Sequence, residues 1–246
     1  MTVNRKLVLT PLLLSLLAAC SSVPLDNRPA ALYKEGEEFY ASQRYEDAIA
    51  QWKKVREAYA SPELTTSAEL KIADAYFDSE RFIEATAAYE EFRKLHPTHE
   101  KAPYALYRIG LSNYNQITGL DTDQTPQKNA VIHFEDFLRR HPKSEYAGEV
   151  KDKLEATVTQ QIQHEQYVAR FYYRTEKFAA TIKRLEELLA AQPKSPLHDE
   201  TWYLIGAARL RSGTPEKAKE AFNRLSTVFP GSRFIMDASK LLEKHY

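Results

Sequence analysis

Few residues of the sequence have the type and spacing that a chemical site requires. The candidates come in pairs: His96 and His99, His164 followed by Glu165, and Asp121 and Asp123. The first pair flanks a proline at a helix end, the second lacks the further histidine of a zinc protease, and the third lacks the other ligands of a calcium loop. We interpret all of them as turn and surface residues. The sequence therefore predicts no catalytic site, no metal site and no resident cofactor, and it favours a protein that is not an enzyme.

Cys20 is the only cysteine in the chain, and it ends the stretch Leu17-Ala18-Ala19-Cys20. An apolar run begins at Leu7, directly after the basic pair Arg5-Lys6. A charged start, a short apolar core and small residues before a cleavage site predict a secretory signal peptide at residues 1–19. The core is about a dozen residues long, too short to span a bilayer as a mature helix.

The residues around Cys20 resemble a bacterial lipobox. The resemblance implies that Cys20 becomes the first residue of the mature chain and carries a diacylglycerol and an N-acyl chain. Ser21 in the next position implies delivery to the outer membrane, in its inner leaflet and facing the periplasm. Each buried methylene contributes roughly 0.8 kcal/mol, so several acyl chains anchor a protein firmly. The alternative is an ordinary signal peptide with an accidental cysteine.

The composition of the mature chain is typical of packed amphipathic helices. Residues 20–29 contain two prolines and no helical period, which indicates a flexible tether. The whole chain has 34 basic and 34 acidic residues, and two of the basic ones lie in the signal peptide. The mature chain is thus slightly acidic, which argues against a nucleic-acid partner.

A repeated pattern organises residues 30–230 into five units. Each unit has a first helix with one small residue, and a second helix with apolar residues at offsets 0, 3, 7 and 10, which place one stripe on a helix face. The small residues are Gly36, Ala73, Gly110, Ala169 and Gly206. The pattern resembles the tetratricopeptide repeat (TPR). The sequence therefore predicts an all-α solenoid of five helix pairs, with a capping helix in residues 231–246.

The third and fourth units are longer than the others. Residues 116–125 form a long connection in the third, with Thr125 as the expected cap of the next helix and Pro126 just inside it. The first helix of the fourth unit is expected to run from about Glu145 to Thr175. We expect an N-terminal half at 30–143 and a C-terminal half at 144–246.

A possible peptide groove follows from ring positions on the first helices. Positions three before and four after the small residue lie seven apart on one face and are not used by the pair packing. The predicted groove residues are Tyr33, Tyr40, Phe77, Tyr104, Tyr107 and Tyr114. Tyrosine combines apolar area with a polar tip, which suits peptide capture. Packing of these rings between neighbouring first helices is an equally open alternative.

The chain also resembles the BamD/ComL family of TPR lipoproteins, which belong to the outer-membrane β-barrel assembly (BAM) machinery. The motifs that carry this resemblance are His-Pro-Thr-His at 96–99 with Tyr104, Tyr107 and Gly110, the Asp-x-Asp-Gln-Thr loop at 121–125, and the run at 165–172 with Ile182 and Arg184. Together with the lipobox and the repeats, they cover about 200 residues.

The resemblance implies a scaffold. In the family, the C-terminal repeats dock on the POTRA region of the barrel protein BamA, and the N-terminal repeats are associated with unfolded barrel precursors and accessory lipoproteins. Carried over to this chain, Arg184 and Arg170 are expected at the BamA interface. The alternatives are a pilotin-type TPR lipoprotein that assists secretin assembly, a cell-wall enzyme or its activator, and a periplasmic adaptor with no barrel client.

Overall fold

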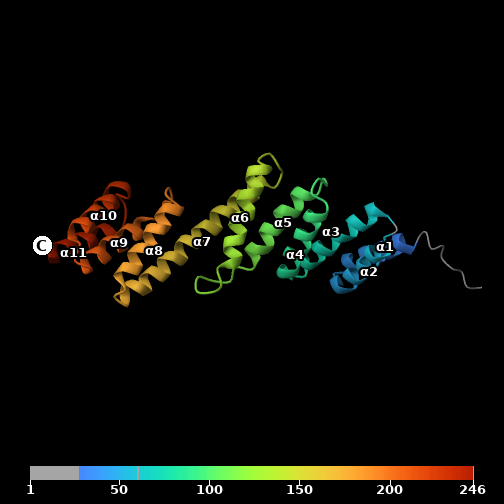
Figure 1. The fold of residues 1–246 in the computed structure, drawn as a ribbon, viewed down its shortest axis with the longest axis horizontal. Helices are drawn as coiled ribbons and strands as arrows, with labels where there is room; N and C mark the ends of the chain where they lie inside the picture. The colour runs from blue at the N-terminus through green and yellow to red at the C-terminus, as the bar shows by residue number, and fades with distance from the viewer. Residues whose placement is uncertain (1–27, 60, 246) are drawn as a thin grey trace, which may run out of the picture. The chain divides into compact units, whose positions relative to one another are not determined.

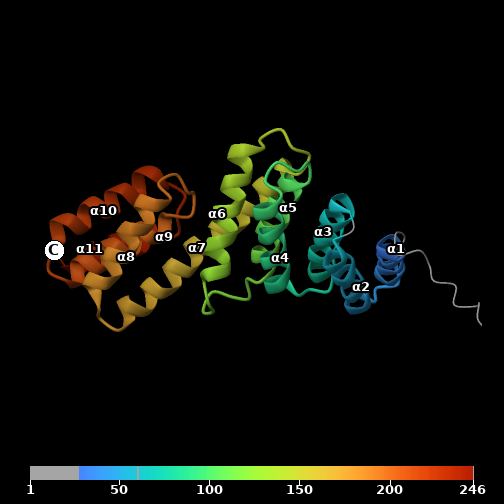
Figure 2. The same ribbon diagram turned by 45° about the vertical axis from the view of Figure 1, so that its right-hand side comes forward.

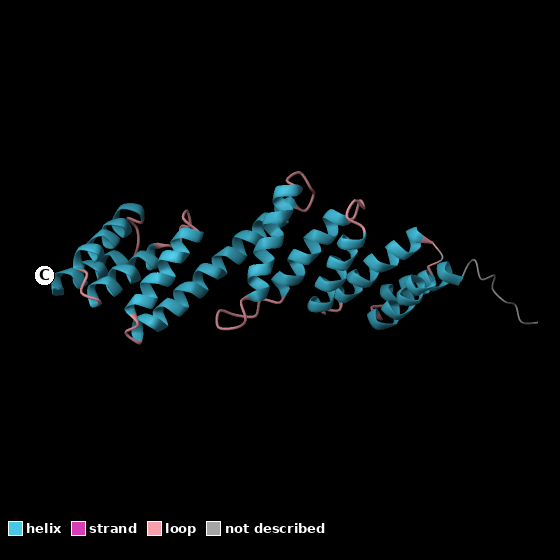
Figure 3. Ribbon diagram, viewed as in Figure 1, coloured by secondary structure: helices cyan, strands magenta, loops and turns pink. Residues whose placement is uncertain are grey.

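Helices form wherever the apolar spacing of three and four residues repeats. The computed structural model describes residues 28–59 and 61–245, which form helices and turns without a strand (Figure 3). Within those residues, the helices are α1 (Arg28–Ala41), α2 (Tyr45–Ala58), α3 (Pro62–Asp78), α4 (Phe82–Leu95), α5 (Ala102–Asn115), α6 (Thr125–Arg140), α7 (Ala147–Arg174), α8 (Phe178–Ala191), α9 (Asp199–Arg211), α10 (Pro215–Val228) and α11 (Phe234–His245). The signal peptide and Cys20 lie outside the described residues. The all-α repeat fold is confirmed.

The chain divides into two compact units, residues 1–75 and 76–246, and α3 contributes to both. Figures 1 and 2 label the helices of each unit. The expected division at 143/144 falls inside the second unit, in the turn between α6 and α7. Helix α1 already includes Arg28 and Pro29, the last two residues of the expected tether, because proline fits the first turn of a helix. None of the described helices combines the length and the apolar character needed to cross a membrane.

In the first unit, the α1–α2 hairpin closes around a single tryptophan. Trp52 is fully buried, and its ring lies against Gly36 of α1, where an added Cβ would come within 2.8 Å of the Trp52 Cδ1 atom. The indole Nε1 also donates a hydrogen bond of 3.2 Å to the backbone oxygen of Tyr33. Ala48 and Val55 complete the buried stripe of α2. A small residue on the first helix thus admits a large one from the second, as the repeat predicts.

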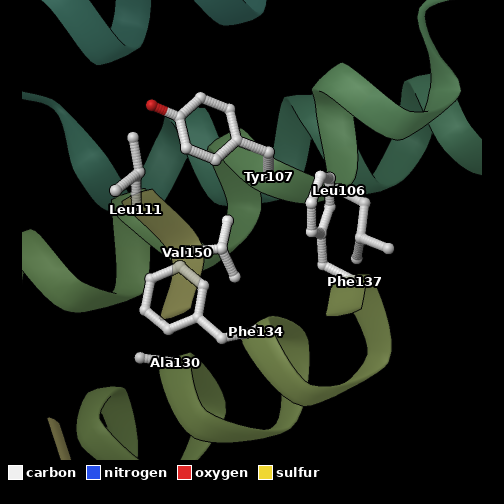
Figure 4. Packing of buried hydrophobic residues seen from close by; sticks show 7 residues of the cluster. All are labelled: Leu106, Tyr107, Leu111, Ala130, Phe134, Phe137 and Val150. Atoms are coloured by element: carbon white, nitrogen blue, oxygen red, sulfur yellow. The ribbon is translucent and has the colours of Figure 1, made fainter. Parts of the chain in front are cut away.

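Apolar clusters repeat this arrangement in the second unit. The first holds Leu106, Tyr107, Leu111, Ala130, Phe134, Phe137 and Val150. Figure 4 shows that α5, α6 and α7 all supply side chains to it, with Val150 between the rings of Phe134 and Tyr107. The later clusters join α7, α8, α9 and α10, and then α9, α10 and α11. Helix α11 therefore covers the last hairpin, as a capping helix should.

The turns inside four of the hairpins share one geometry. Gln43, Glu80, Glu176 and Gly213 each have a left-handed φ between 59° and 76° at the same place in the turn. The backbone N–H of the residue that follows each one returns to a carbonyl oxygen five residues earlier, as from Arg81 to Tyr76 at 2.8 Å. The same backbone hydrogen bond occurs in the turns of the other three hairpins, so these four turns have one structure.

The third hairpin departs from this turn. Residues 116–124 join α5 to α6 there, and α6 begins at Thr125. The expected Thr125 cap is wrong by one residue, because Gln124 holds the N-cap position and makes no side-chain capping hydrogen bond. The Oδ1 of Asp123, one residue earlier, accepts from the Thr125 N–H at 2.9 Å and from the Thr125 hydroxyl at 2.8 Å. These two hydrogen bonds hold the pKa of Asp123 below its usual value. Helix α7 is the long helix that was expected, about 42 Å from its 28 residues.

Candidate partner-binding surfaces

The two predicted groove residues of the first unit lie on α1 against Trp52. The rings of Tyr33 and Tyr40 have centroids 6.3 Å and 5.7 Å from the Trp52 ring, and both side chains are half-buried. The Lys71 ammonium stands 5.6 Å from the Tyr40 ring centroid. Burial, with the charges of Glu37 and Asp74, raises the pKa of Tyr33. Each ring thus packs on Trp52 and keeps an exposed edge that a partner can reach.

The second unit holds the other four predicted groove residues, and Tyr107 lies deepest. Tyr107 is only 7% exposed and stacks on Tyr146, with centroids 4.5 Å apart and planes at 9°. Its hydroxyl donates a 2.7 Å hydrogen bond to the Glu149 carboxylate of α7, and burial together with this bond raises its pKa well above the usual value. Tyr107 thus packs between helices, which is the alternative that the sequence analysis left open for these rings.

Arg108 organises the half-buried rings around Tyr107. Its guanidinium lies 3.6 Å from the Phe77 ring centroid and 5.6 Å from that of Tyr104. It also donates to the Tyr89 hydroxyl at 3.0 Å and to the Asp78 carboxylate at 3.1 Å. The sequence analysis missed this residue, although an arginine next to a predicted groove tyrosine is a signal for cation–π packing.

A second cation completes the ring set of this unit. The Lys153 ammonium of α7 lies 4.5 Å from the ring centroid of Tyr114. Tyr114 in turn packs on Phe134 at 6.5 Å. Three of the predicted groove residues, Phe77, Tyr104 and Tyr114, therefore each have a cation near the ring face. A cationic edge of this kind favours partners that are apolar or acidic.

The two predicted interface arginines form ion pairs on different sides of α7. Arg184 of α8 is 32% exposed in its side chain and pairs with Glu165 of α7 at 2.5 Å. Arg170 of α7 is 46% exposed and pairs with Glu200 of α9 at 3.2 Å. Five residues separate Glu165 from Arg170, which is about 140° around a helix. The structure therefore does not bring the two arginines into one cluster.

Aromatic side chains on α7 accompany these arginines. Tyr167 and Phe171 are four residues apart and are among the few large apolar side chains exposed in the described residues. The Arg184 guanidinium lies 5.8 Å from the ring centroid of Tyr172. Arginine and aromatic side chains together are typical of the centres of protein interfaces.

The residues first considered for chemistry have structural roles. The His99 Nδ1 accepts from the Lys101 backbone N–H at 3.1 Å, and the ring packs on Phe92 at 5.4 Å. The His164 Nδ1 contacts the Leu120 backbone oxygen and so ties the 116–124 loop to α7. The described residues contain no cluster of three or more potential metal ligands.

A family model described as outer membrane lipoprotein, YfiO, matches residues 25–214. The chain belongs to this family. The YfiO match includes both arginines and all six predicted groove residues. A tetratricopeptide repeat model matches residues 200–232, which cover most of the α9–α10 hairpin.

Two relatives of this YfiO-family chain share one description. The outer membrane protein assembly factor BamD of Neisseria meningitidis serogroup A is 25% identical over 253 residues, which cover 95% of each chain. The protein so named in Vibrio cholerae is 31% identical over 195 residues, or 74% of this chain and 81% of the relative. A solved structure, the TPR2AB domain of yeast Sti1 in complex with an HSP90 peptide, aligns with a TM-score of 0.45 at 13% identity, covers 88% of this chain and 82% of that one, and carries no functional argument.

Family membership confirms the resemblance drawn from the motifs. It identifies an outer membrane lipoprotein with TPR repeats, in a family whose relatives are outer membrane protein assembly factors. The residue assignments at the groove and at Arg184 and Arg170 stay predictions.

Proposed function

We propose that this chain is a non-enzymatic scaffold lipoprotein of the BAM machinery. It docks on the POTRA region of BamA and helps to recognise, insert and assemble unfolded barrel proteins. The observation that supports the proposal best is the similarity to an outer membrane protein assembly factor over 95% of both chains. Stacked helical hairpins also suit the role, because they offer extended surfaces to other chains.

In this proposal, the lipid anchor determines where the protein is located. Acyl chains on Cys20 hold it in the inner leaflet of the outer membrane, with the helical hairpins in the periplasm. Barrel precursors reach the membrane from that side. Other lipoproteins of the machinery are further candidate partners, and the near-neutral charge argues against nucleic acid.

The proposed groove for barrel precursors uses the rings of the first helices. Tyr33 and Tyr40 present their outer edges in the first unit, and Phe77, Tyr104 and Tyr114 do so in the second. Tyr107 supports the second set from beneath through its stack on Tyr146. Crosslinkers at Tyr40, Phe77 and Tyr114 in living cells should capture barrel precursors, and capture of a secretin subunit would favour the pilotin alternative.

The proposed BamA face lies around Arg184, with Arg170 on the other flank of α7. The Arg184–Glu165 pair is partly exposed, so on its own it contributes only about 0–1 kcal/mol to stability. A charge reversal there should therefore leave the fold intact and act on binding. This separation of stability from binding makes the site testable.

The test is co-purification of BamA with the tagged chain from solubilised outer membranes. Arg184→Glu should reduce the recovery of BamA at least tenfold, because it places a negative charge next to Glu165. Lys183→Glu is the matched control, since Lys183 is the preceding residue on α8 and its side chain is 79% exposed. Unchanged recovery with Arg184→Glu would remove Arg184 from the interface.

A further inference from the structure

The first hairpin carries opposite charges at its two ends. The α1–α2 turn forms one end, and the start of α1 meets the end of α2 at the other, where the Trp52 indole donates to the Tyr33 carbonyl. Residues 28–34 and 52–59, at this second end, contain five basic residues and one acid: Arg28, Lys34, Lys53, Lys54, Arg56 and Glu57. Residues 35–51, toward the turn, contain one basic residue and five acids: Arg44, Glu35, Glu37, Glu38, Glu46 and Asp47. The hairpin is therefore positive at the end away from its turn.

The neighbouring segments do not cancel this positive charge. Asp26 before α1 and Glu63 at the start of α3 add two acids, so basic residues still outnumber acids by five to three. The side chains of Lys34 and Lys54 are exposed, and that of Arg56 is half-buried. Basic residues at the end of a helix also suit its dipole, so the charge alone does not identify a partner.

Tyr59 gives this end of the hairpin a second unusual feature. It directly follows α2, has a left-handed φ of 47° and is 82% exposed. The residue at the same place in each later hairpin is half-buried, has φ between −130° and −127°, and donates its backbone N–H to a carbonyl oxygen four residues earlier; these residues are His96, His141, Gln192 and Phe229. A left-handed backbone is uncommon for a bulky residue. Since the fold gains little packing from the Tyr59 ring, a contact outside the chain accounts for it better.

The lipid anchor determines what lies next to this end. Residues 21–27 separate Cys20 from α1, and a chain of that length spans at most about 28 Å. In the proposed function, the acyl chains of Cys20 lie in a bilayer, so the start of α1 stays near the headgroups of that bilayer. A tethered contact forms at a high effective concentration, so even a weak contact is populated.

Anionic phospholipid headgroups are complementary to both features. Basic residues near a membrane surface are attracted to anionic lipids, which tightens association by about fivefold per residue. Tyrosine is enriched at the headgroup level, because its ring is apolar and its hydroxyl is polar. We propose that the anchor end of the first hairpin, formed by residues 28–34 and 52–59, binds the anionic phospholipid surface of the membrane that holds Cys20.

This contact would give the first unit a fixed side toward the membrane, which a flexible tether alone does not provide. The inference rests on the proposed function in one respect, because it needs the acyl chains on Cys20. It adds a second, electrostatic attachment to the lipid anchor, and membrane attachment through two signals is stronger than through one.

The test places a fluorescent probe at the anchor end of the full-length acylated lipoprotein. Acylation blocks the thiol of Cys20, so Ala58→Cys supplies the one reactive thiol for an environment-sensitive dye. The protein is reconstituted in phosphatidylcholine vesicles with or without about 30% phosphatidylglycerol. The emission should shift to the blue only with phosphatidylglycerol, and about 1 M salt should remove the shift by screening. Ser42→Cys in the α1–α2 turn is the matched control and should show no shift.

Charge reversal separates the anchor end from the rest of the surface. Lys54→Glu with Arg56→Glu should weaken the contact by roughly tenfold or more, because two positive charges become negative. Lys217→Glu with Lys219→Glu on α10 makes the same change of net charge and should have no effect. Tyr59→Ser should weaken the contact by about three- to tenfold and leave the melting temperature unchanged, since the ring is exposed. Tyr59→Trp should keep the contact, because tryptophan suits the headgroup level equally well.

An equal shift on vesicles of phosphatidylcholine alone, or an unchanged shift with Lys54→Glu and Arg56→Glu, would overturn the inference. The same shift with a Glu decapeptide in place of phosphatidylglycerol would assign the anchor end to an acidic protein partner and would also overturn it. A chain that shows the shift but fails to recover BamA would contradict the proposed function alone. A chain that recovers BamA without the shift would contradict this inference alone.

Discussion

Glycines on the first helices set how closely a hairpin can close. An added Cβ at Gly110 would come within 2.5 Å of the Phe134 ring, and one at Gly206 within 2.6 Å of the Phe222 ring. Both rings are buried in the cores of their hairpins. The repeat pattern alone predicted these small positions, because close approach of two helices leaves room for only a small residue.

Gly206→Ala should destabilise the protein by about 1–3 kcal/mol, because the new methyl group displaces the buried Phe222 ring. The better helix propensity of alanine offsets only part of that loss. Chemical denaturation followed by circular dichroism measures the change. Gly148→Ala is the matched control: Gly148 lies on α7 with nothing within 4 Å of an added Cβ, so it should be neutral or slightly stabilising. Equal effects at the two sites would contradict the packing argument.

His133 gives the fold a dependence on pH. Burial lowers its pKa from the usual 6.5, against the opposing charge of Glu90 at 3.9 Å. The folded state therefore resists a proton that the unfolded chain accepts. Stability from this group is present above pH 6.5 and is lost as the pH falls through the lower pKa of the folded state.

His133→Gln should accordingly flatten the loss of stability between about pH 7 and pH 5. Urea denaturation midpoints at several pH values measure it. His99→Gln controls for the loss of a histidine. If the slope with His133→Gln matches that of the unmodified chain, His133 is not the source of the dependence.

Contacts between residues that lie far apart in the sequence could not be predicted from its periodicity. The offsets on each first helix placed Tyr107 among the predicted groove residues, and the structure buries it between helices. Its partner Glu149 lies 42 residues later, so neither the hydrogen bond nor the stack on Tyr146 follows from periodicity. The same holds for Arg108, which binds Asp78 across 30 residues.

At the scale of elements, the 116–124 loop and α7 distinguish this chain from a regular repeat. The sequence predicted both, because extra residues between two apolar periods must form a longer turn or a longer helix. It favoured Thr125 as the cap, whereas Gln124 takes the N-cap position and Asp123 accepts from the Thr125 N–H, a difference that only geometry settles. It also missed the contact of His164 with the Leu120 carbonyl, which joins elements 44 residues apart.

His164→Ala should release the loop from α7 and leave the helix folded. Loss of one hydrogen bond should speed backbone amide exchange in residues 117–123 by roughly three- to tenfold. Hydrogen–deuterium exchange with mass spectrometry measures it, and Gln163→Ala on the exposed face of α7 is the control. Unchanged exchange in the loop would show that other contacts hold it.

At the scale of the whole molecule, we propose that a lipid anchor holds a helical repeat array at the membrane. The anchor was predicted from Cys20 and the apolar run before it, which lie outside the described residues. The repeat array was predicted from small and apolar positions and is confirmed. Partner surfaces could be predicted least, because a groove or an interface depends on a second molecule that the periodicity of one chain does not encode.

The most direct test of the central claim is to deplete this protein in the bacterium that makes it and to measure folded outer-membrane barrel proteins by their heat-dependent gel mobility. The account predicts that their amount falls severalfold, and that the unmodified chain restores it better than the Cys20→Ser variant, which lacks the anchor. Unchanged barrel proteins, or a loss confined to secretin rings, would contradict the account.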